Sequence, residues 1–208
     1  MKKLSLNRLY FYLLLMVIVF GCASFPKKKT PVSNLNSENI SNLNGRYELI
    51  EKYSGGTKDT STIWKSAFNF SSADRGHYPT FFDEINFQVF KENELKVDSL
   101  KTYSFTLKLI DSKNLKIDYY ENDSLFFGNT IKYKFKNDGY IYLISTNSEV
   151  VGIPYLFGGV TKKRSRITLN KENDLLFETS EVVTGGLLFV LVNPGEKMKY
   201  EKVFQRIE

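Results

Sequence analysis

The chain is short of the residues from which many active sites and covalent cross-links are built. Its 208 residues include one cysteine, one histidine and one tryptophan. A single cysteine excludes an intramolecular disulfide, and one histidine cannot make a histidine-rich zinc site. We interpret His77 as a loop residue near Pro79, and no Gly-x-Ser-x-Gly motif presents a serine nucleophile. These shortages favour a protein that is not an enzyme and that uses no metal or cofactor.

A strong charge of one sign is also missing once the N-terminal segments are set aside. The whole chain has a formal net charge of +6. Removing the six basic residues and one acidic residue of 1–44 leaves 23 basic and 22 acidic residues in 45–208. A domain this close to neutrality lacks the concentrated basic face that nucleic-acid binding needs, so we expect no nucleic-acid partner.

The N-terminus has the three-part pattern of a secretory signal. Lys2, Lys3 and Arg8 form a basic leader, the run from Leu9 to Phe20 is uncharged, and small residues follow it. The twelve residues of this run are fewer than the roughly 18–20 that a helix needs to cross a bilayer. Extending the apolar stretch to Phe25 keeps a tight membrane span open as an alternative.

The segment Val19-Phe20-Gly21-Cys22 ends this signal. It resembles the lipobox of bacterial lipoproteins. The resemblance implies cleavage between Gly21 and Cys22, a diacylglycerol in thioether linkage to Cys22, and an N-acyl chain such as palmitate on the new amino group. Cys22 could otherwise be an ordinary thiol beside an uncleaved anchor. Ala23 after the cysteine, with no aspartate, resembles lipoproteins that are sent to the outer membrane, so we expect a lipid-anchored protein of the bacterial cell envelope.

Residues 22–44 are rich in Ser, Asn, Pro and Lys and have no apolar period. Such a segment buries too little surface to offset its ordering entropy. We therefore expect a lipidated, disordered tether over 22–44 and a single β domain over 45–208. Lys27-Lys28-Lys29 lies close to the lipid, where it is either a contact for anionic headgroups or a solvated charge run.

From Gly45 on, short runs alternate apolar and polar residues and are separated by turns. One example places Tyr103, Phe105, Leu107 and Leu109 on one face of a strand, and Asn137-Asp138-Gly139 is a strong hairpin signal. Period-two runs with frequent turns predict about 9–10 antiparallel strands, which tend to close into a barrel or fold into a sandwich. We expect an all-β, mainly antiparallel barrel or half-barrel meander, with one short helix between residues 59 and 83.

Two short motifs bracket this domain. It opens with Gly45-Arg46-Tyr47 and closes with Phe204-Gln205-Arg206. Together with the lipobox and the polar tether, they resemble the lipocalin-like lipoproteins of Gram-negative bacteria, whose first strand often begins Gly-x-Trp or Gly-x-Tyr and whose last ends aromatic-x-Arg. Tyr47 stands where lipocalins usually have tryptophan, and the two-cysteine staple of many lipocalins is absent. The resemblance implies a lipocalin-like barrel that holds an apolar ligand.

Two apolar stretches, 150–157 and 182–192, stand out within the domain. They either pack on each other or under a helix, or they form a ligand mouth, a membrane-touching rim or a partner-binding patch. Arg164 and Arg166 follow the first stretch and could pair with an acidic ligand group. The candidate ligand or partner patch comprises Ile153, Tyr155, Leu156, Phe157, Arg164 and Arg166.

The predicted function is a non-catalytic, membrane-anchored envelope lipoprotein that binds an apolar or amphipathic small molecule. A structural or assembly lipoprotein that docks another envelope protein through an exposed apolar patch is the alternative. A hydrolase-type enzyme is the second alternative, for which Glu178 with Glu181 and Asp118 with Glu121 are candidate acid–base pairs.

Overall fold

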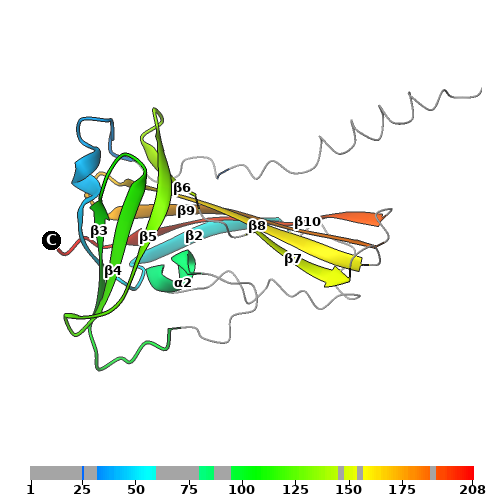
Figure 1. Ribbon diagram of the computed structural model, residues 1–208, viewed down its shortest axis with the longest axis horizontal. Helices are drawn as coiled ribbons and strands as arrows, with labels where there is room; N and C mark the ends of the chain where they lie inside the picture. The colour runs from blue at the N-terminus through cyan, green and yellow to red at the C-terminus, as the bar shows by residue number, and fades with distance from the viewer. Residues whose placement is uncertain are drawn as a thin grey trace, which may run out of the picture.

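Alternating side chains produce the antiparallel sheet that the sequence predicts. The computed structural model describes residues 25, 32–59, 80–86, 95–144, 148–153, 157–187 and 191–208, with 53–59, 148–153, 157–161, 183–187 and 191–198 as backbone alone. Its strands join into one ten-stranded sheet in which every pairing is antiparallel (Figure 1). The strands are β1 (Gly45–Glu48), β2 (Tyr53–Asp59), β3 (Tyr103–Leu109), β4 (Asn114–Glu121), β5 (Ser124–Lys136), β6 (Tyr140–Ile144), β7 (Ser148–Ile153), β8 (Phe157–Leu169), β9 (Leu175–Leu187) and β10 (Leu191–Phe204).

The ten strands trace an eight-strand meander. The sheet order is β1-β3-β4-β5-β6-β8-β9-β10-β2. β6 and β7 pair with successive parts of β8, while β2 pairs with β10 and β1 with the residues that follow β10. The Glu48 amide donates to Gln205 O at 2.8 Å and the Arg46 amide to Glu208 O at 3.0 Å. These bonds join the first and last strands into a nearly closed, lipocalin-like barrel, as predicted.

The two bracketing motifs meet where the barrel closes. The Arg206 guanidinium lies 5.5 Å from the Tyr47 ring centroid and donates to Asn42 O at 2.8 Å and to Asn44 O at 2.5 Å. A Cβ on Gly45 would lie 2.5 Å from Arg206 Nη2. It would also lie 2.7 Å from the backbone oxygen of Glu208. Glycine is favoured here because this backbone atom and the hydrogen-bonded arginine both approach so closely.

Aromatic rings fill the end of the barrel near this closure. Phe81 stacks on Phe105 with centroids 4.1 Å apart and meets Phe177 and Phe204 edge-on. Such aromatic pairs stabilise a core beyond the apolar area that they bury. We call this set the aromatic floor, and it comprises Tyr47, Phe81, Phe105, Tyr119, Phe177 and Phe204, all fully buried.

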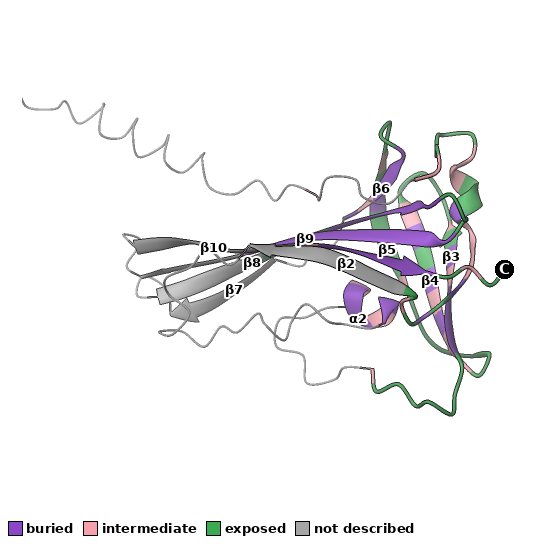
Figure 2. Cartoon of the chain, turned by 180° about the vertical axis from the view of Figure 1, so that it is seen from behind, coloured by how far each residue is buried: buried purple, intermediate pink, exposed green. Residues whose placement is uncertain are grey.

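Phe81 comes from the short helix α2 (Phe81–Ile85), whose N-cap Thr80 accepts a hydrogen bond from the Asp83 amide at 3.1 Å. The sequence predicted one short helix between residues 59 and 83. The helix that the structure describes begins at Phe81, near the end of that range, and residues 60–79 lie outside the described residues. Figure 2 shows buried residues in α2 and along parts of β6 and β9.

The segment before β1 corrects the predicted tether. From Val32 on, the chain is bound to the barrel: Val32 forms a β-bridge with Asn170, and the Ser33 amide donates to Leu169 O at 2.8 Å. Leu35 is buried, and Leu43 is buried in the 3₁₀ helix η1 (Ile40–Leu43). The predicted disordered tether over 22–44 therefore extends too far. A few apolar residues bind this segment to the barrel, although its average composition is polar.

Candidate functional site

A carboxylate from α2 lies inside the barrel beside the aromatic floor. Thr80 starts the helix, Phe81 enters the floor, and Glu84 comes three residues later with a fully buried side chain. Residues three apart lie on neighbouring parts of one helix face. The cap and the aromatic anchor therefore fix where this carboxylate points.

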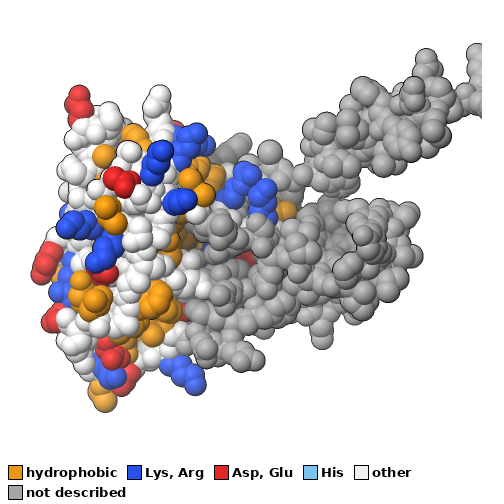
Figure 3. All heavy atoms as spheres, in the orientation of Figure 1, with side chains coloured by type: hydrophobic (Ala, Val, Ile, Leu, Met, Phe, Trp, Pro, Cys, Tyr) orange, Lys and Arg blue, Asp and Glu red, His pale blue; other side chains and the backbone are white. Residues whose placement is uncertain are grey.

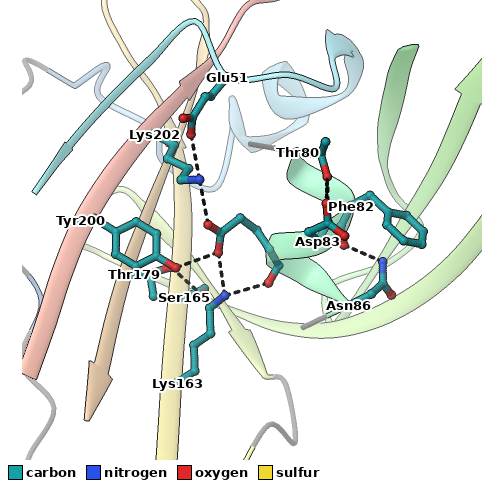
Figure 4. Close-up of polar contacts among 11 residues, drawn as sticks. Glu51, Thr80, Phe82, Asp83, Asn86, Lys163, Ser165, Thr179, Tyr200 and Lys202 are labelled. Carbon is teal, nitrogen blue, oxygen red and sulfur yellow. Dashed lines mark hydrogen bonds and ion pairs between the residues drawn. The ribbon is translucent and has the colours of Figure 1, made fainter. Parts of the chain in front are cut away.

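Charged and hydroxyl groups from two strands converge on Glu84; the three side chains that supply them, Lys163, Tyr200 and Lys202, are labelled in Figure 4. Lys163 Nζ donates to Glu84 Oε2 at 2.6 Å and to the Glu84 carbonyl at 3.1 Å. The Tyr200 hydroxyl donates to Oε2 at 2.8 Å. Lys202 Nζ lies 3.0 Å from Glu84 Oε1 and 2.8 Å from Glu51 Oε2. We call Glu51, Glu84, Lys163, Tyr200 and Lys202 the charged cluster.

Strand register explains why lysines face the interior. On β8, Lys163 and Ser165 are in phase with the core residue Ile167, so all three occupy the inner face. Ser165 and Thr179 of β9 share a hydrogen bond of 3.1 Å, and Thr179 is opposite Tyr200 of β10. The side chains of Lys163 and Lys202 are only 2% and 1% exposed. The charged cluster is thus part of the inner wall, next to the aromatic floor.

The electrostatics keep Glu84 ionised. Burial alone would raise the pKa of the Glu84 carboxyl, but the ammonium groups of Lys163 and Lys202 outweigh it and hold the pKa below its ordinary value. Burial, together with the Glu84 and Glu181 carboxylates, raises the pKa of Tyr200 well above its ordinary value. At neutral pH the Glu84 carboxyl is therefore ionised and the Tyr200 phenol protonated.

The residues of the predicted ligand or partner patch that the structure describes lie in different environments. Arg164 is exposed on the outer side of β8. Arg166 donates to Glu178 Oε2 at 2.6 Å, so this chain supplies the acidic partner that we expected from a ligand. Ile153, the last residue of β7, pairs with Phe157, the first residue of β8. Tyr155 and Leu156 lie outside the described residues, as do Gly21, Cys22 and His77.

Neither candidate acid–base pair comes together. Glu178 binds Arg166 on the outer face of β9, whereas Glu181 is opposite Lys163 and belongs to the inner face. Asp118 pairs with Lys116 at 2.7 Å. Glu121 accepts hydrogen bonds from Lys101 and Tyr103. Glu178, Asp118 and Glu121 thus each bind a partner other than the carboxylate with which they were paired.

A surface feature that the sequence did not single out lies at the start of β5. Leu125, Phe126 and Phe127 are 59%, 40% and 41% exposed. The Phe127 ring lies 5.5 Å from Phe82 of α2 and 5.9 Å from Tyr119. In the described part of the chain, the edge of β5 that faces β6 has strand partners only from Lys132 to Lys136. This exposed apolar segment, Leu125–Phe127, therefore borders a stretch of β5 edge that has no strand partner among the described residues.

The charged cluster was missed because its members are far apart in sequence. The only available signal was a lysine in phase with apolar residues, at Lys163 and Lys202.

Within the described ranges, no group of three or more His, Cys, Asp and Glu side chains is arranged to hold a metal ion. No helix in those ranges is both long and apolar enough to cross a membrane. Comparisons of the chain with protein-family models, curated proteins and solved structures gave no match.

Proposed function

We propose that the protein is a lipid-anchored envelope protein whose barrel binds one amphipathic small molecule without catalysing a reaction. The charged cluster in the inner wall is the observation that carries this proposal. Burying ions is expensive, and well-packed apolar residues often stabilise a core as well or better. If the interior served only to stabilise the fold, apolar side chains would therefore be sufficient there. A charged wall beside an aromatic floor suits the headgroup of an amphiphile.

The course of the strands is consistent with an apolar tail beyond that headgroup. β8, β9 and β10 continue past the cluster, where β7 and β2 pair with them (Figure 1). The sequence there is apolar over 150–157 and 182–192. Ligand sites commonly combine apolar walls with a few polar groups that fix orientation. A charged headgroup at Lys163 and Lys202 with a tail toward β7 follows this pattern.

The state of Glu84 favours binding over acid–base catalysis. A general base that works near neutrality needs a pKa near the working pH, and carboxyl groups reach it through a raised pKa. The two lysines lower the pKa of Glu84 instead. A carboxylate held in this way can orient the ammonium groups around a headgroup.

The binding test uses three probes with one alkyl chain and different headgroups: a fatty acid, an alkylamine and an alcohol. Displacement of a fluorescent fatty acid would report their affinities. We expect one charged probe to bind at least about tenfold more tightly than the alcohol, since a hydrogen bond to a charged group contributes about 1.5–3 kcal/mol. The double variant Glu84→Gln/Lys163→Met should lose this preference, and Glu48→Gln, on the exposed side of β1, should keep it. Equal affinities for all three probes would refute headgroup recognition.

The anchor at Cys22 has a separate test. Cells grown with a radioactive fatty acid should label the wild-type protein, and fractionation should place it in the outer membrane. The Cys22→Ala variant should carry no label, because the thioether cannot form. Label on that variant would contradict anchoring at Cys22.

Docking of another envelope protein is the second candidate. The exposed segment Leu125–Phe127 favours it, beside a stretch of β5 edge that has no strand partner among the described residues. Exposed apolar surface and unpaired strand edges are both common interaction sites. A photocrosslinker at Leu125 should then give one discrete adduct in intact cells, and Phe126→Ser/Phe127→Ser should abolish it. A crosslinker at Lys113 serves as the control. No adduct from Leu125 would end this candidate.

A further inference from the structure

The outer surface of β5, β6 and β8 is basic although the domain is nearly neutral. Lys132, Lys134 and Lys136 alternate along β5, and Lys162 and Arg164 lie on β8; all five are exposed. Asp138 is the only acidic residue in 124–144 and 157–169. It accepts a hydrogen bond from the Tyr142 hydroxyl at 2.6 Å. Lys and Arg side chains are gathered where Figure 1 places β5 and β6 (Figure 3). We call this surface the basic face.

The side chain of Phe25 packs on this face against Arg166 and Tyr142, and we call this packing site the seat. Its ring centroid lies 4.4 Å from the Arg166 guanidinium, which is 3.8 Å from the Tyr140 ring on another side. Phe25 also meets Tyr142 edge-on, with centroids 5.5 Å apart. Glu178, whose side chain is 1% exposed, holds Arg166 at 2.5 Å. The guanidinium is thus held by contacts that do not involve Phe25, and cation–π contacts of this kind stabilise such a seat.

The seat brings the lipid-bearing end of the chain to the basic face. Cys22 precedes Phe25 by three residues, and three residues span at most about 11 Å. Lys27-Lys28-Lys29 follows Phe25 directly after Pro26. If a lipid is attached to Cys22, this short distance would hold the basic face within about one Debye length of the lipid headgroups.

We propose that the basic face docks on an anionic lipid surface, with Phe25 setting the orientation of the barrel on the membrane. This inference rests on the proposed lipid at Cys22. Each basic side chain near an anionic bilayer strengthens the contact about fivefold. In this arrangement the barrel lies against the membrane rather than hanging free from it.

The test uses the lipidated full-length mature protein, purified from membranes and reconstituted in phosphatidylcholine vesicles with or without phosphatidylglycerol. A membrane-impermeant amine-acylating reagent then labels exposed lysines, and peptide mass spectrometry maps the sites. We expect Lys132, Lys136 and Lys162 to be labelled at least about fivefold less when phosphatidylglycerol is present. Labelling of Lys96, an exposed lysine outside the basic face, provides the reference.

Two matched double variants and one seat variant sharpen the result. Lys134→Glu/Arg164→Glu should abolish the protection, whereas Lys96→Glu/Lys108→Glu, with the same change of charge, should keep it. Phe25→Ser should reduce it because the seat is lost. A protein that floats with both kinds of vesicle but shows equal labelling in them would overturn docking while leaving the anchor intact. A protein that carries no lipid and does not float would refute the anchor itself.

Discussion

Replacing Glu84 with glutamine removes the central negative charge of the charged cluster while keeping the shape of the side chain. The glutamine oxygen can still accept a hydrogen bond from Tyr200, but it cannot balance Lys163 at 2.6 Å or Lys202 at 3.0 Å. Lys202 keeps Glu51 at 2.8 Å. Breaking a buried ion pair by removing one partner costs about 3–5 kcal/mol. We expect the free energy of unfolding to fall by about that amount.

Urea denaturation followed by circular dichroism measures this change. With a slope of about 2 kcal/mol per molar urea, the midpoint should fall by roughly 2 M. Glu48→Gln, at an exposed position of β1, should leave the midpoint unchanged. Glu84→Gln/Lys163→Met should recover part of the loss, because the two positions are directly coupled. An unchanged midpoint for Glu84→Gln would refute the account of this buried pair.

The stability difference between wild type and Glu84→Gln should also depend on pH in a direction that the pKa of Glu84 determines. The pKa of Glu84 is held below its ordinary value of 4.5 in the folded protein. Its ionisation therefore stabilises the fold above pH 4.5, and this contribution is lost as the pH falls through the lower, folded-state pKa. The difference in stability between wild type and Glu84→Gln should shrink over that range. A difference that grows on acidification would contradict the assignment.

Three further predictions concern packing and the buried phenols. Gly45→Ala should lower the free energy of unfolding by about 1–3 kcal/mol in urea denaturation, because its Cβ would meet Arg206 at 2.5 Å; wild-type stability would contradict the close approach. Phe81→Ala should cost about 3–5 kcal/mol in the same assay, since the ring is fully buried against Phe105; a loss below 1 kcal/mol would be inconsistent with that packing. Burial raises the pKa of Tyr47 to about 12, and it also raises the pKa of five other tyrosines: Tyr119, Tyr133, Tyr140, Tyr142 and Tyr200. Protonated phenols therefore stabilise the fold below pH 10, and this contribution is lost as the pH rises through their folded-state pKa values. The absorbance of phenolate should then lag behind that of free tyrosine until the protein unfolds, and full ionisation near pH 10 in folded protein would contradict it.

The strand architecture was readable from sequence because period-two alternation is a local signal. The predicted inward set from Tyr103 to Leu109 forms β3, and the hairpin signal at Asn137-Asp138-Gly139 turns β5 into β6, with Gly139 at φ +81°. A turn that needs positive φ selects glycine, so the residue type itself marks the position. The bracketing motifs were visible too, although only the fold places Arg206 on Tyr47.

The charged cluster was not readable in the same way. Glu84 lies in a five-residue helix, too short to show a helical period. Its partners on β8 and β10 become neighbours only through sheet register and barrel closure. The attachment of residues 32–44 was missed for a related reason, since a few apolar side chains such as Leu35 and Leu43 determine it while average composition suggests disorder. Long-range contacts decided both cases.

Native mass spectrometry tests the proposed role most directly. Mature protein would be extracted gently from its membrane, without washes that strip small molecules, and its intact mass recorded before and after mild activation. We predict a chain that carries covalent acyl groups on Cys22 and one additional amphiphile that dissociates on activation, and that is absent from Glu84→Gln/Lys163→Met. A wild-type chain with its covalent lipid but no dissociable ligand, both as isolated and after incubation with the three alkyl probes, would contradict the account.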